Sequence, residues 1–157
     1  MPTPGINAQL RNAELGFRVQ GAAKTVPVAA TQTVFTVTGG RIMVALLYGL
    51  VTTVIGGTTP AAKYVATPTT GTANDMCTTG TITAAEVGSM FVLPVAKASA
   101  LIISTASSGS QTGPGLGGQI VAPGTIGFND AAADATGAVQ HTLFYIPLDP
   151  ATTVVAN

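Results

Sequence analysis

The longest strand-like run in the sequence is Arg41-Ile-Met-Val-Ala-Leu-Leu-Tyr-Gly-Leu-Val-Thr-Thr-Val-Ile55. Strict alternation along a strand divides its apolar residues between two faces. One face holds Ile42, Val44, Leu46, Tyr48 and Leu50, and the other holds Met43, Ala45, Leu47 and Val51. Two apolar faces are typical of a central strand covered on both sides, by a second sheet and by either an arm or a neighbouring subunit. Gly49 in the middle of the run indicates a bulge or a bend.

Shorter strand-like runs lie on both sides of this segment, between stretches rich in Gly, Pro, Ser and Thr. Their β-branched or alternating apolar residues predict strands at 15–19, 33–38, 62–67, 89–95, 100–104, 119–121, 125–128 and 138–148. Many short strands separated by turns favour a sandwich or a jelly roll. We therefore expect an all-β, jelly-roll-like β-sandwich over residues 31–157, with no more than single helical turns at 83–86 and 130–135.

Residues 1–30 leave two interpretations open. Pro2, Pro4 and Gly5 disfavour regular structure, while the spacing of apolar residues after them allows a short helix over 6–14. The segment holds three of the six basic and one of the six acidic residues, together with apolar anchors that a disordered tail does not need. The first interpretation is an N-terminal arm that contacts a neighbouring subunit. The alternative is that residues 15–28 form the first pair of strands of the same sandwich.

Charge is scarce throughout the chain. Charged residues make up 8% of it, against about 25% in an ordinary soluble domain, and six basic residues balance six acidic ones. Low net charge gives little repulsion between copies, so we expect a homo-oligomer, specifically a homotrimer. The basic residues are scattered singly, so we expect no nucleic-acid partner, which needs clustered Lys and Arg.

We expect neither a membrane partner nor a signal peptide. The most apolar stretch, residues 42–51, is shorter than the about 20 residues that span a bilayer. The first twenty residues contain Arg11, Glu14 and Arg18 and no continuous apolar run, which is unlike a secretory signal.

Residues with catalytic potential are few and isolated. Cys77 and His141, the only cysteine and histidine, are types that can pair as nucleophile and base, but no known signature surrounds Cys77. A buried small hydrophobe is the better interpretation of Cys77. His141 lies in the apolar run 138–148, where a packed or interface histidine with one bonded ring nitrogen is the better interpretation. We therefore expect no catalytic residues and no enzymatic activity.

Two further patterns resemble ligand sites only formally. Gly113, Gly115 and Gly118 match the spacing G-x-G-x-x-G, but a strand-like segment follows them where the dinucleotide fingerprint requires a helix. Asp130 and Asp134 are too few for a calcium loop, and one His with one Cys cannot close a zinc site. We therefore expect a flexible loop at the glycines, a solvated turn at the two aspartates, and no cofactor or metal.

Several segments, in a fixed order, carry a resemblance to a known group of proteins. They are 40–55, Lys63-Tyr-Val-Ala-Thr-Pro-Thr-Thr-Gly-Thr72, Asp75-Met-Cys77, Ala122-Pro-Gly-Thr-Ile126 and Thr136-Gly-Ala-Val-Gln-His-Thr-Leu-Phe-Tyr-Ile-Pro-Leu-Asp149. Together they look like small virion structural proteins of tailed bacteriophages. The resemblance covers roughly residues 31–157 and finds no motif in residues 1–30. It implies a particle component, such as a capsid decoration (cement) protein, and carries over no catalytic residue.

We therefore expect a capsid decoration protein that binds and stabilises a phage head shell. Its partner would be the major capsid protein, and its location the virion, assembled in the host cytoplasm. The alternative is a tail, fibre or baseplate module, either structural or receptor-binding. A receptor module needs exposed aromatic residues, and this chain has no Trp and three Tyr, all in strand-like runs. A shell-forming coat protein is disfavoured, because the common tailed-phage subunit is larger and contains a long helix.

Overall fold

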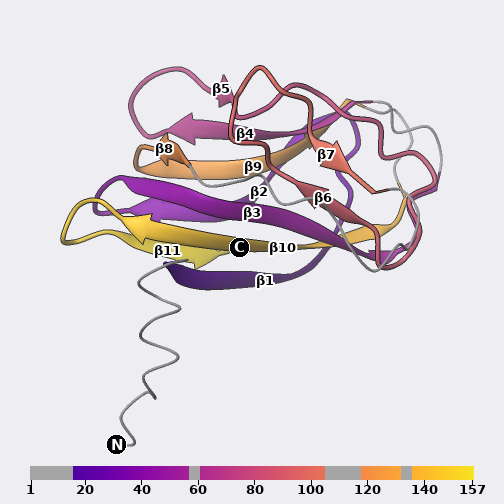
Figure 1. Cartoon of the computed structure of the whole chain (residues 1–157), viewed down its shortest axis with the longest axis horizontal. Helices are drawn as coiled ribbons and strands as arrows, with labels where there is room; N and C mark the ends of the chain where they lie inside the picture. The colour runs from indigo at the N-terminus through magenta and orange to yellow at the C-terminus, as the bar shows by residue number, and fades with distance from the viewer. Residues whose placement is uncertain (1–15, 57–60, 105–117, 132–135) are drawn as a thin grey trace, which may run out of the picture.

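The chain folds into two antiparallel β-sheets packed face to face, in a computed structural model that describes residues 16–56, 61–104, 118–131 and 136–157 (Figure 1). Sheet A lies nearer the viewer in Figure 1, and sheet B lies behind it. In spatial order, sheet A contains β1 (Phe17–Thr25), β10 (Ala138–Pro147), β3 (Ile42–Thr53), β6 (Met90–Val92) and β7 (Ile102–Ile103), with β8 (Gln119–Val121) also paired with β3. In spatial order, sheet B contains β11 (Thr153–Ala156), β2 (Ala30–Thr38), β9 (Gly124–Asp130), β4 (Ala62–Pro68) and β5 (Asn74–Asp75).

This arrangement confirms the predicted all-β sandwich. The jelly-roll subclass and the N-terminal arm stay predictions. The described part of the chain contains no helix, and therefore none long and apolar enough to cross a membrane. Residues 83–86 do not form a helical turn. Instead, the Ala85 N–H donates to the Ile82 carbonyl at 3.2 Å, and Ala84 adopts a positive φ of 57°.

β1 is an edge strand of sheet A. Its partner is β10, in a register that runs from Phe17 opposite Tyr145 to Thr25 opposite Ala138. Residues 17–25 therefore belong to the sandwich. They lie within residues 1–30, for which the sequence allowed either an arm or the first strands of the sandwich. Residues 1–15, including the short helix predicted over 6–14, lie outside the described residues.

β3 is the central strand of sheet A, as its two apolar faces predicted, but its faces differ from strict alternation. Phe144 pairs with Leu46 and Tyr145 pairs with Val44, so Ala45 is an extra residue in a β-bulge. A second register shift lies at Thr52, where Ala138 pairs with Thr53 and Val139 pairs with Val51, and neither shift lies at Gly49. The predicted division of the faces is therefore wrong. The residues that face sheet B are Ile42, Val44, Leu47, Gly49 and Val51, and those that face outward are Met43, Leu46, Tyr48 and Leu50.

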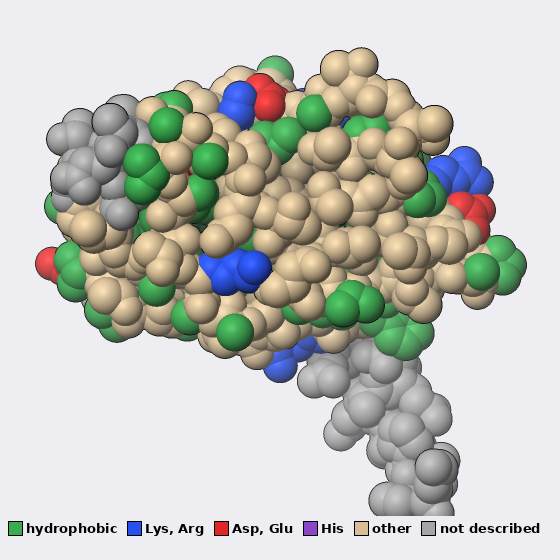
Figure 2. All heavy atoms as spheres, turned by 180° about the vertical axis from the view of Figure 1, so that it is seen from behind, with side chains coloured by type: hydrophobic (Ala, Val, Ile, Leu, Met, Phe, Trp, Pro, Cys, Tyr) green, Lys and Arg blue, Asp and Glu red, His purple; other side chains and the backbone are tan. Residues whose placement is uncertain are grey.

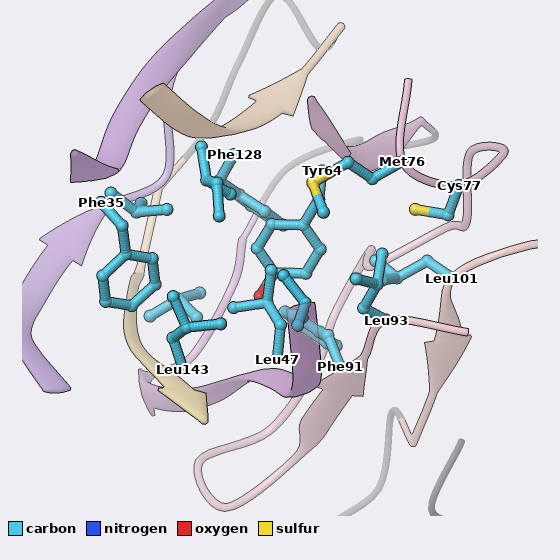
Figure 3. Packing of buried hydrophobic residues seen from close by; sticks show 14 of the residues in the cluster. Phe35, Leu47, Tyr64, Met76, Cys77, Phe91, Leu93, Leu101, Phe128 and Leu143 are labelled. Atoms are coloured by element: carbon cyan, nitrogen blue, oxygen red, sulfur yellow. The ribbon is translucent and has the colours of Figure 1, made fainter. Parts of the chain in front are cut away.

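The hydrophobic core fills the space between the two sheets (Figure 3). Leu47 and Leu143 from sheet A meet Phe35 and Phe128 from sheet B, and all four are at most 1% exposed. The core continues under the connections between strands, where it contains Met76, Cys77, Leu93 and Leu101. The prediction that Cys77 is a buried small hydrophobe is confirmed.

An ion pair joins the β2–β3 turn to the β10–β11 turn. The Arg41 guanidinium donates to both carboxylate oxygens of Asp149, at 3.0 and 2.9 Å, and the Arg41 backbone N–H donates to the same group at 2.8 Å. These hydrogen bonds lower the pKa of Asp149 to about 2. Gly39 makes the close approach possible, since its φ is +77° and a Cβ there would lie 2.0 Å from the Ala151 carbonyl oxygen.

We expect Leu47→Ala to lower the free energy of unfolding by about 2–5 kcal/mol, because it leaves a cavity in the core centre. Val155→Ala is the control. Val155 is apolar but 59% exposed, so its loss should change stability by less than about 0.5 kcal/mol. Urea unfolding followed by circular dichroism measures both changes. Equal effects of the two substitutions would contradict the inward orientation of Leu47.

Candidate functional site

A buried polar pair links the two sheets. The Tyr64 hydroxyl, from β4 in sheet B, lies 3.0 Å from Nδ1 of His141, from β10 in sheet A. Tyr64 is 0% and His141 3% exposed. The Phe128 ring packs against both, with centroid distances of 5.3 Å to Tyr64 and 5.0 Å to His141. The prediction of a packed histidine with one bonded ring nitrogen is confirmed.

Gly49 makes room for this pair. It faces sheet B from β3, and a Cβ at this position would lie 2.7 Å from Val139 Cγ1, 3.2 Å from the Tyr64 hydroxyl and 3.3 Å from His141 Nδ1. A side chain at position 49 would therefore clash with the Tyr64 hydroxyl, which lies in the space between the two sheets.

Burial keeps these groups neutral. It lowers the pKa of His141 to about 3, with a smaller contribution from the positive charge of Lys24. Burial also raises the pKa of Tyr64 well above its usual value and raises the pKa of the Cys77 thiol. A neutral imidazole, a protonated phenol and a protonated thiol inside the core have no surface to offer a substrate. Their arrangement is that of structural groups.

The acidic residues singled out in the sequence do not form a solvated turn together. Asp130 ends β9 and is 0% exposed, so the prediction of a solvated side chain there is wrong. The reason is alternation, which places Asp130 on the same inward face as Phe128. Asp134 lies outside the described residues. Within the described ranges, no three His, Cys, Asp or Glu side chains come together as metal ligands would.

The glycine-rich segment gives no site either. Gly113 and Gly115 lie outside the described residues. Gly118 directly precedes β8, where a Cβ would lie 2.3 Å from the Val44 carbonyl oxygen. Gly118 is therefore explained by the close packing of β8 beside β3.

A shallow cleft of about 530 Å³ opens beside the start of β1. Its walls are about equally polar and apolar, and its lining residues are Phe17, Tyr145, Pro147, Leu148, Asp149, Pro150 and Thr152. The Asp149 carboxylate is already bound by Arg41. Among the described residues of the lining, the other titratable side chain is the phenol of Tyr145.

The outer surface of sheet A is unusually apolar. Directly opposite residues of antiparallel strands point to the same side, so the register identifies which residues face outward with Leu46. We call eight apolar members of this side the apolar face: Met43, Leu46, Tyr48, Leu50, Met90, Ile120, Phe144 and Ile146. Val92, Ile102, Gln140 and Thr142 point the same way, and of these Val92 and Thr142 are at most 5% exposed. Ile120 is 65% exposed, and the other seven are half-buried. A cluster of this kind on a surface marks an interaction site.

The outer surface of sheet B is different, because hydroxyl groups dominate it. Thr36, Thr125 and Thr67 form a row across β2, β9 and β4, and the hydroxyls of Thr38 and Thr153 lie 2.8 Å apart. Figure 2 views the molecule from this side and shows few hydrophobic or charged side chains over most of the surface. The sandwich therefore has one apolar and one neutral polar side.

Sequence reasoning recognised that β3 is apolar on both sides and grouped Leu46 with Tyr48 and Leu50, but it placed Met43 on the opposite face. It could not add Met90, Ile120 or Phe144, because these residues come from three other strands and meet β3 only through the register. The run of apolar residues on both sides of β3 was the signal that such a face exists.

Comparisons with family models, with curated proteins and with solved structures each found no match to this chain.

We expect Tyr64→Phe to lower the free energy of unfolding by about 1–3 kcal/mol, because it leaves Nδ1 of His141 buried without its partner. The ring shape is kept, so the effect reports the hydroxyl alone. Tyr48→Phe on the outer surface is the matched control and should change stability by less than about 0.5 kcal/mol. If Tyr64→Phe leaves the free energy of unfolding in urea unchanged, the Tyr64–His141 hydrogen bond does not stabilise the fold.

We expect stability to fall as the pH drops from 6.5 to 4.5. In this window the unfolded chain protonates His141, whose usual pKa is 6.5, while the folded chain with its pKa of about 3 does not. The unfolded state then binds more protons, so acid favours it by roughly 1 kcal/mol per pH unit. The chain has a single histidine, so His141→Gln should make the same measurement nearly flat. An equal slope in both proteins would assign the pH dependence to other groups.

Proposed function

We propose that this protein is an accessory structural component of a bacteriophage particle, a decoration protein that binds and stabilises the head shell. The observation that carries the proposal is the apolar face, which gives a small β-sandwich a surface suited to permanent contact. Its sparse charge supports the same function, since neutral polar and apolar surfaces lose little hydration on assembly. The resemblance of residues 31–157 to small phage virion proteins supplies the kind of particle.

The order of strand pairing supports a jelly-roll winding. The ladders are nested along the sequence: β4 pairs with β5, β3 with β8, β2 with β9 and β1 with β10. Successive members of this nest alternate between the two sheets, as in a long hairpin rolled up into a sandwich. Jelly rolls of this type occur in viral capsid domains. This support is one of fold analogy, since the same fold serves other functions.

The aromatic residues favour a head protein over a receptor-binding tail module. Tyr64 is 0% and Tyr145 7% exposed, and Tyr48 is half-buried among the side chains of the apolar face. Sugar-binding sites commonly use exposed aromatic rings. None of these three tyrosines stands free on the surface, and among the described aromatic residues Phe17 is the strongly exposed one, at 51%. The partner in this proposal is the major capsid protein, which the protein would bind as a homotrimer.

Mass spectrometry of particles purified from the phage that encodes this chain tests the proposal. We expect the protein in mature particles at a copy number comparable with that of the major capsid protein. A few copies per particle would assign it to the tail, fibre or baseplate instead. Absence from purified particles would contradict a virion function altogether.

A further inference from the structure

We infer that the apolar face of sheet A binds a second copy of this chain. The inference rests on the proposed function, because it names the partner that an assembly surface of this protein meets first. It assigns contacts between copies to the outside of β3, β10, β6 and β8, and it leaves the hydroxyl-rich surface of sheet B outside that interface.

The size of the apolar face fits the centre of a stable interface. β10, β3 and a third column shared by the three-residue strands β6 and β8 are spaced about 4.8 Å apart, and at about seven residues per column and about 3.4 Å per residue they cover roughly 340 Å². A standard interface buries about 800 Å² per partner, with an apolar centre and a polar rim. The apolar face therefore supplies a little under half of such an interface.

The polar rim lies along β1. Arg18 and Gln20 sit opposite Phe144 and Thr142 and so point outward beside the apolar face. Arg18 donates from its guanidinium to the Gln20 side-chain oxygen at 2.6 Å. Among the outward-facing residues of the described strands of sheet A, Arg18 is the one with a charge. Two copies can therefore meet at this face without burying an unpaired charge at its centre.

Charge also explains why the partner is another copy. The chain has a formal net charge of zero, so long-range repulsion does not keep copies apart. A partner rich in charge, such as nucleic acid, would find no counter-charges on this face. A closed oligomer removes the face from water and stops further association.

The test introduces one charge on each side of the sandwich. Leu46→Glu places a carboxylate at the centre of the apolar face, opposite Phe144. Thr125→Glu is the matched control, since Thr125 is also half-buried and lies on the central strand of sheet B. Light scattering after size-exclusion chromatography measures the mass of each protein at micromolar concentration, and circular dichroism checks that each is folded.

We expect the wild type and Thr125→Glu to have the same mass, a small multiple of 15.5 kDa. Leu46→Glu should raise the dissociation constant at least about 100-fold and run as a monomer, because its carboxylate would be unpaired between apolar surfaces. If Leu46→Glu fails to fold, Leu46→Thr keeps strand propensity and should raise the dissociation constant about tenfold through lost apolar contact.

Three results would overturn the inference. The first is a monomeric wild type. The second is a folded Leu46→Glu or Leu46→Thr variant that keeps the wild-type dissociation constant, and the third is a Thr125→Glu variant that dissociates as fully as Leu46→Glu. Binding to purified phage heads separates this inference from the proposed function. A monomeric wild type that decorates heads, and loses decoration on Leu46→Glu, would assign the apolar face to the shell and leave the decoration function standing.

Discussion

The structure depends on one property of β3, the strand that carries apolar residues on both of its faces. Sheet B packs on the inner face of β3, where Leu47, Gly49 and Val51 point toward it. The bulge at Ala45 changes which residues face inward, so that Val44 and Leu47 both reach the core although they are an odd number of positions apart. The same bulge turns Leu46 outward beside Phe144. Core formation and exposure of the apolar face are therefore two consequences of one register.

The strands were predictable where a period of two extends over several residues, as it does in β3, β4 and β10. β5 and β11 were missed, because they have only two and four residues and their pairing partners, not their composition, place them in sheet B. The bulge was not predictable either. A β-bulge is a relation between two strands, and the sequence of β3 alone is compatible with a break at either Ala45 or Gly49.

The polar interior marks the other limit of the sequence. The surroundings of His141 indicated a packed histidine, but nothing near it identified Tyr64, which is 77 positions away. That pair forms because Gly49 leaves space on the strand next to β10. Asp130 shows the opposite error, since its neighbours resemble a solvated turn while its position in β9 directs it inward. In both cases the deciding factor is the strand on which the residue lies and the face it shares.

The two outer surfaces of the sandwich differ in chemistry, and the overall composition does not reveal this difference. Averaged over the chain, low charge indicates only weak repulsion between copies. Divided between the sheets, it becomes an apolar side with Leu46 and Phe144 and a hydroxyl side with Thr36 and Thr125. Hydroxyl groups keep their hydrogen bonds with water, so the second side can face solvent or meet a hydrated surface at little cost. The proposed contact between copies uses the apolar side, and the proposed decoration of a shell would then use the hydroxyl side.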